Sequence, residues 1–309
     1  MTAPVGLPLP DADASVTPIG RGRREWLLTV VLLAPSVAVF GVFVFYPLVR
    51  TIYLGLHQSD PFGISLDYVG LSRYGDVLGS EGFRRSLWVT VKYALLTVPT
   101  GLLLGLGLAV LANRQLRGMR VFRTIFSSTV ATSVAVAALM WLTLLNPSIG
   151  MVNQLLDTFG IDPIPFLQRP GWALVSISMA TVWQNLGFTF IVISAGLGSI
   201  PDELLESARV DGAGPWRRFR EITLPLLSPT LLFAFVVLTI RAFQSFGEVD
   251  LLTQGGPLRS TRVLVYDVFR NASTDPSRAA AEAVVLFLII LVLTLVQLRV
   301  LERRVHYAA

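Results

Sequence analysis

Six long apolar stretches, separated by polar segments, dominate the hydrophobic pattern of this chain. Each reaches the roughly 20 residues that a helix needs to cross a hydrocarbon core of about 30 Å. Backbone groups inside a bilayer have no water to bond, so such stretches favour helices. The pattern predicts an all-α membrane protein with six transmembrane helices near residues 26–49, 87–112, 120–145, 172–200, 224–246 and 279–301.

Composition agrees with one polytopic membrane domain. Of the 309 residues, 53% are hydrophobic and 15% are charged, against about 45–50% and about 25% in soluble domains. The first 20 residues are polar and Pro-rich, and the apolar run after them is too long for a signal peptide. We therefore expect a disordered cytoplasmic tail at 1–24, a membrane domain at 25–304 and a short tail at 305–309.

Arginine supplies nearly all of the positive charge, because Lys92 is the only lysine and the formal net charge is +5. Basic residues of membrane proteins collect in cytoplasmic loops, so this charge gives no reason to expect a nucleic-acid partner. The distribution places both termini in the cytoplasm. The arginines that carry this prediction are Arg21, Arg23, Arg24, Arg114, Arg117, Arg120, Arg123, Arg209, Arg217, Arg218, Arg220, Arg299, Arg303 and Arg304.

Several kinds of chemistry are excluded by missing residues. The chain has no cysteine and its histidines are His57 and His306, so thiol catalysis, disulfides and a Cys- or His-rich metal site are ruled out. No Gly-x-x-x-x-Gly-Lys-[Ser/Thr] loop is present to bind ATP. The spans contain no acid pair or Ser–His pair for intramembrane proteolysis. We expect neither an enzyme nor a bound cofactor or metal.

The segment at 201–225, between the fourth and fifth predicted spans, has the pattern of two short helices on the cytoplasmic side. Pro201, followed by acidic residues, is a helix start that complements the helix dipole. Gly212 is expected to end that helix in a tight turn. Trp216 and Phe219 would begin a second short helix with a basic face.

This segment resembles the Glu-Ala-Ala loop of bacterial ABC importer permeases, type I, with Ser207 in place of the middle alanine. The resemblance implies a cytoplasmic coupling helix that docks on a dimer of separate ATPase subunits, which use ATP and Mg²⁺. It also implies a second homologous permease subunit and an extracytoplasmic solute-binding protein as partners in the bacterial plasma membrane. The implied docking residues are Glu206, Ala208, Asp211, Gly212, Ala213, Phe219, Ile222, Leu224 and Pro225.

Other segments are similar to the carbohydrate-uptake branch of this superfamily. They are Ala34-Pro35, Phe45-Tyr46-Pro47 and the run at 252–257. The stretches at 211–219 and 296–307 are similar to glycerol-3-phosphate and glycerophosphodiester permeases of the UgpA type. The resemblance therefore implies half of a path for these phosphate esters, with a neutral disaccharide or oligosaccharide as the alternative cargo. A secondary carrier is the alternative class, but it would need no docking loop.

Polar residues within or beside the spans are the candidates for the path, because burying a charge in a bilayer is costly. Arg241, Gln244 and Glu248 follow at helical spacings, so they can share one face. They either form an internal polar network or line the path, where Arg241 would offset a phosphate charge. A neutral sugar would instead favour Trp183, Gln184 and Asn185. Lys92 either joins the path or extends to the membrane surface.

Three further positions complete the expectations for the extracytoplasmic side. Glu282 opens the sixth span and is expected at the membrane interface. The segments at 68–74 and 255–262 are candidate surfaces for the binding protein, because they fall in the predicted outer loops.

Overall fold

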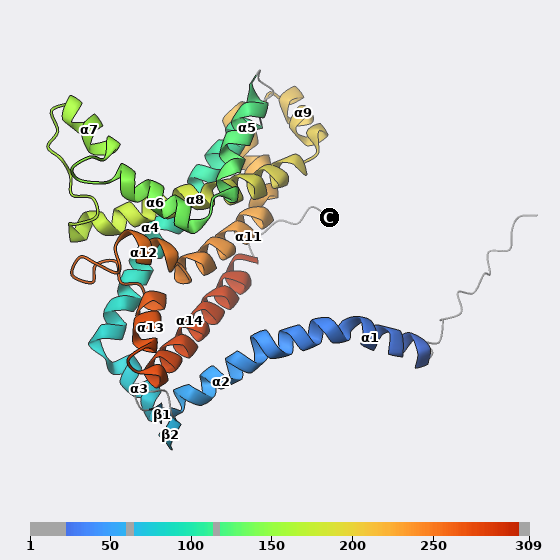
Figure 1. Cartoon of the computed structure of the whole chain (residues 1–309). Coiled ribbons are helices and arrows are strands. Elements are labelled where there is room, and N and C mark those ends of the chain that lie inside the picture. The colour runs from blue at the N-terminus through green and yellow to red at the C-terminus, as the bar shows by residue number, and fades with distance from the viewer. Residues whose placement is uncertain (1–22, 60–64, 114–117, 303–309) are drawn as a thin grey trace, which may run out of the picture. The chain divides into compact units, whose positions relative to one another are not determined.

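The structure is a computed structural model that describes residues 23–59, 65–113 and 118–302 (Figure 1). The two predicted tails, except for residues 23 and 24, lie outside the described residues, as do Arg114, Arg117 and residues 303–307. The chain divides into two compact units, Met1–Arg50 and Thr51–Ala309.

The first unit contains α1 (Arg23–Phe40), the π-helical turn η1 (Gly41–Phe45) and the start of α2 (Tyr46–Gly55). Together they form one apolar helix over Trp26–Gly55, so the end predicted at residue 49 was too early. In η1 the Tyr46 N–H bonds to the Gly41 carbonyl, five residues back. The ring of a proline clashes with the carbonyl oxygen four residues before it. The wider π-helical turn leaves space for the ring of Pro47, so the helix continues through it.

Within its described residues, the second unit consists of helices, loops and one hairpin, in which His57 pairs with Tyr68. The sequence did not suggest this hairpin. The elements, in chain order, are β1 (His57–Ser59), β2 (Ser65–Tyr68), α3 (Ser72–Gly79), α4 (Glu81–Ala112), α5 (Met119–Ser127), the 3₁₀ turn η2 (Ser128–Ala131), α6 (Val134–Leu144), α7 (Met151–Thr158), α8 (Pro170–Gly198), α9 (Asp202–Val210), α10 (Pro215–Arg218), the π-helical turn η3 (Phe219–Thr223), α11 (Leu224–Phe243), α12 (Gly247–Leu252), α13 (Leu264–Ala272) and α14 (Pro276–Glu302).

The predicted spans correspond to long apolar helices in five cases. Within the described residues these are Trp26–Gly55, Glu81–Ala112, Pro170–Gly198, Pro215–Phe243 and Pro276–Val300, and the α5–α6 pair is a sixth candidate if its two halves are taken together. The mostly helical membrane fold is therefore confirmed.

The third predicted span, 120–145, is not one straight helix, so that expectation was wrong. The chain bends by 106° between η2 and α6. The hydroxyls of Ser127 and Ser128 donate to carbonyls about one turn back, at 2.7 Å. Ser133 then caps α6 by accepting from the Val136 N–H at 3.2 Å. Hydroxyl side chains that bond to the backbone in this way favour a helix end and a new start.

The fifth helix also differs from its expected limits of 224 and 246. It begins at Pro215, because α10, η3 and α11 follow one another without a break, and it ends at Phe243. In η3 the Leu224 N–H bonds to the Phe219 carbonyl, five residues back, which accommodates Pro225 as η1 accommodates Pro47. The expected second short helix is therefore the first turns of the fifth span.

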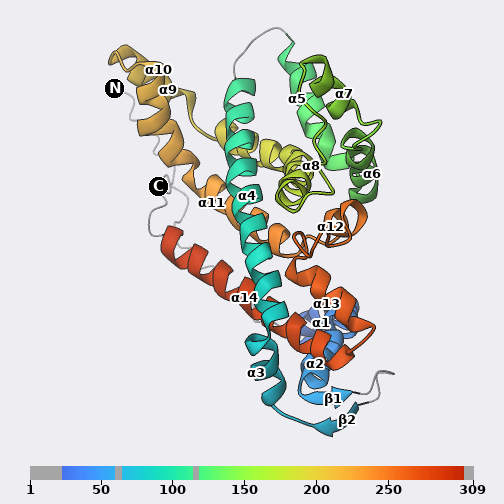
Figure 2. The same cartoon turned by 90° about the vertical axis from the view of Figure 1, so that its left-hand side faces the viewer.

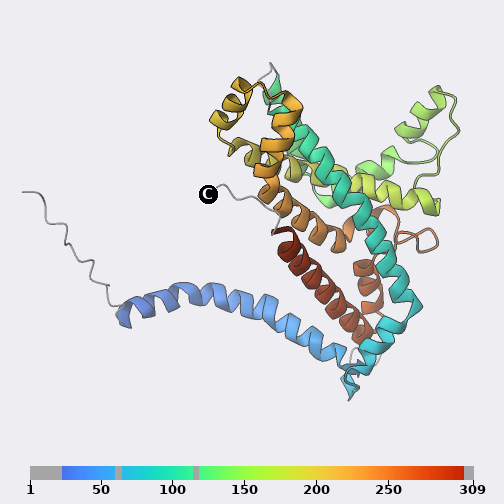
Figure 3. The same cartoon turned by 180° about the vertical axis from the view of Figure 1, so that it is seen from behind.

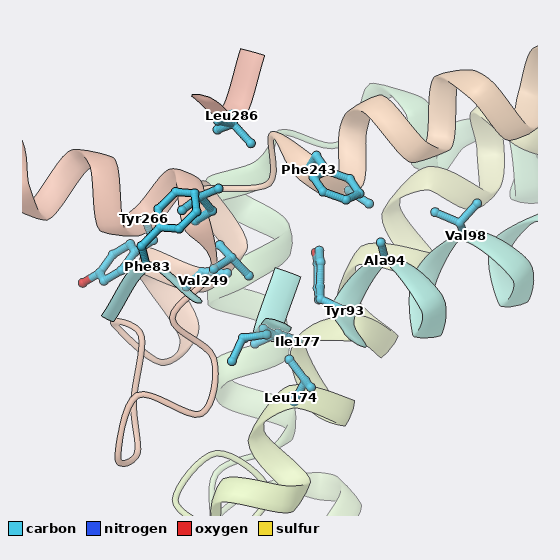
Figure 4. Packing of buried hydrophobic residues seen from close by; sticks show 14 of the residues in the cluster. Phe83, Tyr93, Ala94, Val98, Leu174, Ile177, Phe243, Val249, Tyr266 and Leu286 are labelled. Atoms are coloured by element: carbon cyan, nitrogen blue, oxygen red, sulfur yellow. The ribbon is translucent and has the colours of Figure 1, made fainter. Parts of the chain in front are cut away.

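The core of the second unit lies where α4, α8 and α11 meet (Figure 4). Small residues at Gly101, Gly105 and Ala109 recur every four positions along α4, which lets the neighbouring helices approach closely. A Cβ on Gly105 would lie 2.4 Å from Thr189 Cγ2 of α8. Farther along α4, Ala109 and Ala112 pack in a second cluster.

The two ends of the second unit carry different elements. The cluster around Ala109 and Ala112 contains Leu197 of α8 and Leu227 of α11, so it brings together the helices that flank α9. Figures 2 and 3 show α9 at this end and the β1–β2 hairpin with α3 at the other. With 32 residues, α4 measures about 48 Å from end to end.

The contact at Gly105 provides a test of this packing. Gly105→Ala should destabilise the assembled complex by about 1–3 kcal/mol, because the added methyl must displace Thr189. The measurement is thermal unfolding of the purified complex in detergent. Gly107→Ala on the same helix is the control, since nothing lies within 4 Å of the position that its added methyl would take. Equal midpoints for both variants would contradict the close approach.

Candidate functional site

A cavity of about 420 Å³ opens where α8, α11 and α12 meet the bend between η2 and α6. We call it the polar pocket. Its volume falls in the range of small-molecule sites. Its lining residues are Thr129, Val130, Thr132, Val134, Thr181, Gln184, Asn185, Phe188, Arg241, Gln244, Ser245, Phe246, Gly247 and Glu248.

Arg241 is held in the pocket by two contacts. Its Nη1 donates to Asn185 Oδ1 at 2.8 Å, and its guanidinium carbon lies 4.3 Å from the centre of the Phe188 ring. Arg241 stands in the last turn of α11, where a cation complements the helix dipole. Its side chain remains exposed, so most of its donors are free to meet a ligand.

Gln244 and Glu248 line the pocket, but they do not lie on the same helix as Arg241, although the sequence predicts that they do. The helix ends at Phe243, with Gln244 as its C-cap, and Glu248 lies on the separate helix α12. The prediction that these residues share one helical face with Arg241 was therefore wrong. The chain reversal before α12 nevertheless brings all three to the same cavity.

Glu248 is buried and fully partnered. Its Oε2 accepts from Ser245 Oγ at 2.8 Å. With the Gln184 amide assigned in the orientation that its neighbours favour, its nitrogen donates to Glu248 Oε1 at 3.1 Å and its oxygen accepts from the Val134 N–H at 3.2 Å; in the opposite orientation the nitrogen donates to the Thr132 carbonyl at 3.4 Å. Val134 opens α6, where a backbone N–H has no partner within its own helix. Gln184 thus joins α8 to both α6 and α12.

The phenol of Tyr93 extends this network into the core. Tyr93 is 0% exposed, and its oxygen lies 2.6 Å from Thr181 Oγ1 and 2.9 Å from Ser245 Oγ. Because Ser245 donates to Glu248, Tyr93 donates to Ser245 and accepts from Thr181. Neither Tyr93 nor its partners Thr181 and Ser245 were among the predicted site residues. A tyrosine inside an apolar span was the available signal, since a buried phenol needs a partner.

Lys92 and Trp183, the other candidates for the path, do not line the polar pocket. Lys92 is exposed on α4, with its amine 6.0 Å from the centre of the Trp88 ring. Trp183 packs edge-on against Trp141 at 6.3 Å and faces an apolar groove. Lys92 and Trp183 are therefore separate from the other predicted path residues. Those that line the polar pocket are Gln184, Asn185, Arg241, Gln244 and Glu248.

Glu282 is buried among its own helices, with 1% of its surface exposed, and its expected position at the membrane interface stays a prediction. Its carboxylate accepts from Arg278 Nε at 2.9 Å and from Asn271 Nδ2 at 2.8 Å. Arg278 also donates to Ser80 Oγ at 3.1 Å. The reason is tertiary: α13 folds back on α14 and covers this face of the helix.

A second buried carboxylate, Asp267, organises the loop between α12 and α13. It bonds to Ser86 and Arg262, and Arg259 lies 3.6 Å away. Arg85 donates to the Leu258 carbonyl at 2.9 Å, which fixes the loop beside the first turn of α4. Leu258 itself is 78% exposed. This loop is one of the predicted candidate surfaces, but Asp267 was not predicted, because Arg259 and Arg262 lie in an irregular loop and Ser86 is 181 residues away in sequence.

The expected docking segment is built around the end of α9. Gly212 has φ +77° and its N–H bonds to the Arg209 carbonyl at 3.1 Å. The Ala213 N–H bonds to the Ala208 carbonyl at 2.9 Å, which completes a Schellman cap. Pro201 caps α9 at its start, just before the position expected for it.

Burial differs along this segment. Ala208 is buried, while Glu206, Asp211 and Gly212 are exposed and Val210 is 89% exposed. Phe219, Ile222, Leu224 and Pro225 are half-buried on η3 and the start of α11, and Ala213 is half-buried in the turn. The segment therefore presents an exposed helix end on a turn that continues directly into a span.

Comparison with known proteins gives one consistent result. Residues 98–307 match the family described as "Binding-protein-dependent transport system inner membrane component". The sn-glycerol-3-phosphate transport system permease protein UgpA of Salmonella choleraesuis (strain SC-B67) is 36% identical over 297 residues, 95% of this chain and 99% of that protein. The protein of the same name from Escherichia coli (strain UTI89 / UPEC) is 36% identical over 288 residues, 92% of this chain and 97% of that protein.

A solved structure is similar over the same length. A chain of the bacterial alginate ABC transporter, in complex with alginate pentasaccharide-bound periplasmic protein, superposes with a TM-score of 0.80 at 26% identity. The match covers 93% of this chain and 97% of that chain.

Proposed function

The chain belongs to the family of binding-protein-dependent transport system inner membrane components, and we propose that its cargo is glycerol-3-phosphate or a glycerophosphodiester. It is a multi-pass permease subunit of an ABC importer of the bacterial plasma membrane, and not an enzyme, because ATP is hydrolysed by partner subunits. We further propose that ATP and Mg²⁺ act on a dimer of those partners, and that a second homologous permease supplies the other half of the path.

The polar pocket supports a phosphate cargo through Arg241. A guanidinium with free donors suits a phosphate, and it is worth more in a site shielded from water than on an open surface. Asn185 and Phe188 hold the side chain in place. The other charged group of the lining, Glu248, is occupied by Ser245 and Gln184. The similarity to glycerol-3-phosphate permeases points the same way.

A neutral disaccharide has less support in this pocket. Trp183, which such a sugar would use, faces the apolar groove instead. A neutral ligand would also offer the Arg241 guanidinium no opposite charge. A secondary carrier is disfavoured by the family match.

Replacing Arg241 by Gln tests the cargo. Uptake of glycerol-3-phosphate by the assembled transporter should fall about ten-fold or more, since one charge-assisted hydrogen bond contributes about 1.5–3 kcal/mol. Arg241→Lys should recover part of the uptake, and Arg169→Gln, at an exposed position outside the pocket, should leave it unchanged. Transport of radiolabelled glycerol-3-phosphate and trehalose into proteoliposomes is the measurement. Equal loss for both solutes, or no loss for either, would contradict the role of Arg241.

For the docking segment, we propose that α9 is the cytoplasmic coupling helix that enters a groove of the ATPase. The Schellman cap fixes its exposed end, and η3 connects it to α11 without a flexible linker. Movement of the ATPase would therefore pass into the fifth span and to Arg241 at its far end.

Exposed arginines lie at both ends of the second unit. At the end with α3 and α13, Arg73, Arg262 and Arg278 are paired with buried or half-buried carboxylates. At the end with α9, Arg209 and Arg220 are exposed without an acidic partner within 4.0 Å among the described residues. Arg84 and Arg270, at the other end, are exposed and have no ion pair among the described residues either. We therefore base the proposal that both termini are cytoplasmic on the arginines that the sequence places in the loops on the α9 side.

Gly212→Val tests the docking helix. A β-branched residue at φ +77° costs about 1–2 kcal/mol and would disrupt the cap. We expect the ATPase to be lost on co-purification while the two permeases remain together. Gly214→Ala is the matched control, because its φ is −66° and its surroundings are equally open. Retention of the ATPase by the Gly212 variant would argue against docking through α9.

For the binding protein, we propose that the loop at 255–262 provides a contact. Salt bridges and the Arg85 bond hold it rigidly, and Leu258 projects as an apolar tip. A preorganised apolar side chain loses little entropy on binding. The segment at 68–74, with Leu71 exposed, lies in the same half of the unit.

Leu258→Asp should reduce stimulation of ATP hydrolysis by the loaded binding protein several-fold and leave basal hydrolysis unchanged, because a carboxylate cannot enter an apolar site without cost. Leu258→Met keeps an apolar tip and serves as the control. ATPase assays of reconstituted transporter with and without binding protein separate the two activities. Full stimulation of the Asp variant would exclude Leu258 from the contact.

A further inference from the structure

One stripe of α4 has features that transport does not explain. Trp88, Lys92, Leu96, Thr100 and Leu104 recur at intervals of four, so each lies beside the next along a ridge that winds gradually round the helix. Lys92 is the only lysine of the chain. Among the residues that the structure describes it makes no ion pair. Its amine lies over the ring of Trp88, which is itself exposed.

The deeper half of this stripe forms a wall of an apolar groove of about 390 Å³. Leu96 and Leu104 of α4 face Met179 and Trp183 of α8 across it, and Trp141 of α6 contributes to the lining. The hydroxyl of Ser178, one of its few polar groups, already donates to the Leu174 carbonyl at 2.7 Å. The groove therefore offers hydrocarbon contact and almost no hydrogen bonding.

Helix geometry relates the groove to the bilayer. Lys92 precedes Ala112 by twenty residues, which is about 30 Å along a helix and matches the hydrocarbon thickness. With Ala112 at one interface, Lys92 reaches the level of the lipid headgroups at the other. Leu104 then lies about 18 Å deeper than Lys92, close to the depth of one leaflet, about 15 Å.

We propose that this face binds an anionic phospholipid. The phosphate contacts the Lys92 amine, the Trp88 ring lies at the interface beside it, and one acyl chain occupies the groove from Leu96 to Leu104. Tryptophan is enriched at the headgroup level, and a lysine there attracts anionic lipids. The groove's restriction to one leaflet, below a cation, favours the lipid.

The test uses the complete transporter in nanodiscs of phosphatidylcholine that contain a small fraction of phosphatidylglycerol with a photoreactive acyl chain. After irradiation, labelled peptides are mapped by mass spectrometry. Label is expected on residues 96–104 and 175–186, and unlabelled phosphatidylglycerol should compete while phosphatidylcholine should not. Lys92→Gln should reduce this label roughly five-fold, the equivalent of about 1 kcal/mol per lysine at an anionic surface. Lys92→Arg should retain it.

A second pair of variants tests the groove independently of charge. Met179→Trp fills the groove and should remove the label with Lys92 intact. Leu103→Trp, exposed but outside the groove, should not. Equal labelling by photoreactive phosphatidylcholine, or label unchanged in Lys92→Gln, would overturn the proposal. So would crosslinks from this face to the partner permease in place of lipid. None of these readouts depends on the cargo.

Discussion

The close approach of α4 and α8 at Gly105 is the contact on which the second unit depends. In a bilayer, burial of apolar surface drives helix association only weakly, because lipid tails are as apolar as the helices. Small residues let backbones approach and increase dispersion contacts. Gly105 against Thr189 fixes α4 relative to α8, and this position places Tyr93 within hydrogen-bond distance of Thr181. Without that register the phenol would lose its bond to Thr181 and keep only the bond to Ser245, so part of its hydrogen-bonding capacity would be buried unsatisfied.

From Tyr93 the network continues through Ser245 to Glu248 and Gln184, and so connects the core to the pocket wall. Each donor and acceptor in it has a partner, which makes a buried polar network rigid rather than costly. The charged and amide residues of the pocket therefore have two different roles. Glu248 and Gln184 hold helices together, whereas Arg241 and Gln244 remain exposed to a ligand. The pocket therefore has a fixed wall and free donors on one side.

Charges near the helix ends follow a related rule. Asp267 and Glu282 are both buried, and each has an arginine as an ion-pair partner. A buried carboxylate needs such partners, because desolvation of an unpaired charge is costly. These pairs also determine shape: Asp267 anchors the loop that exposes Leu258. Arg209, Arg217 and Arg220, on α9 and in the turns before α11, are exposed instead. They remain available to water, lipid headgroups or a partner.

The sequence by itself determined the class of the protein. Long apolar stretches specify helices, because backbone groups in a bilayer have no water to bond and must bond to one another. The glycine at position 212 specifies a tight turn, because its positive φ is one that glycine adopts readily. These are local properties, which is why the membrane fold, the end of α9 and the family could be predicted. The convergence of Gln184, Asn185 and Arg241 on one cavity was not contained in any local pattern. It required the bend before α6, the early end of α11 at Phe243 and the reversal into α12. Burial of Glu282 and Asp267 likewise required α13 to pack against its neighbours. Tertiary structure decided these points. Asn185 and Arg241 are 56 residues apart and Ser86 and Asp267 are 181 residues apart, so no local pattern joins them. The helical spacing of Arg278 and Glu282 is visible in the sequence, but it does not show that α13 covers the pair.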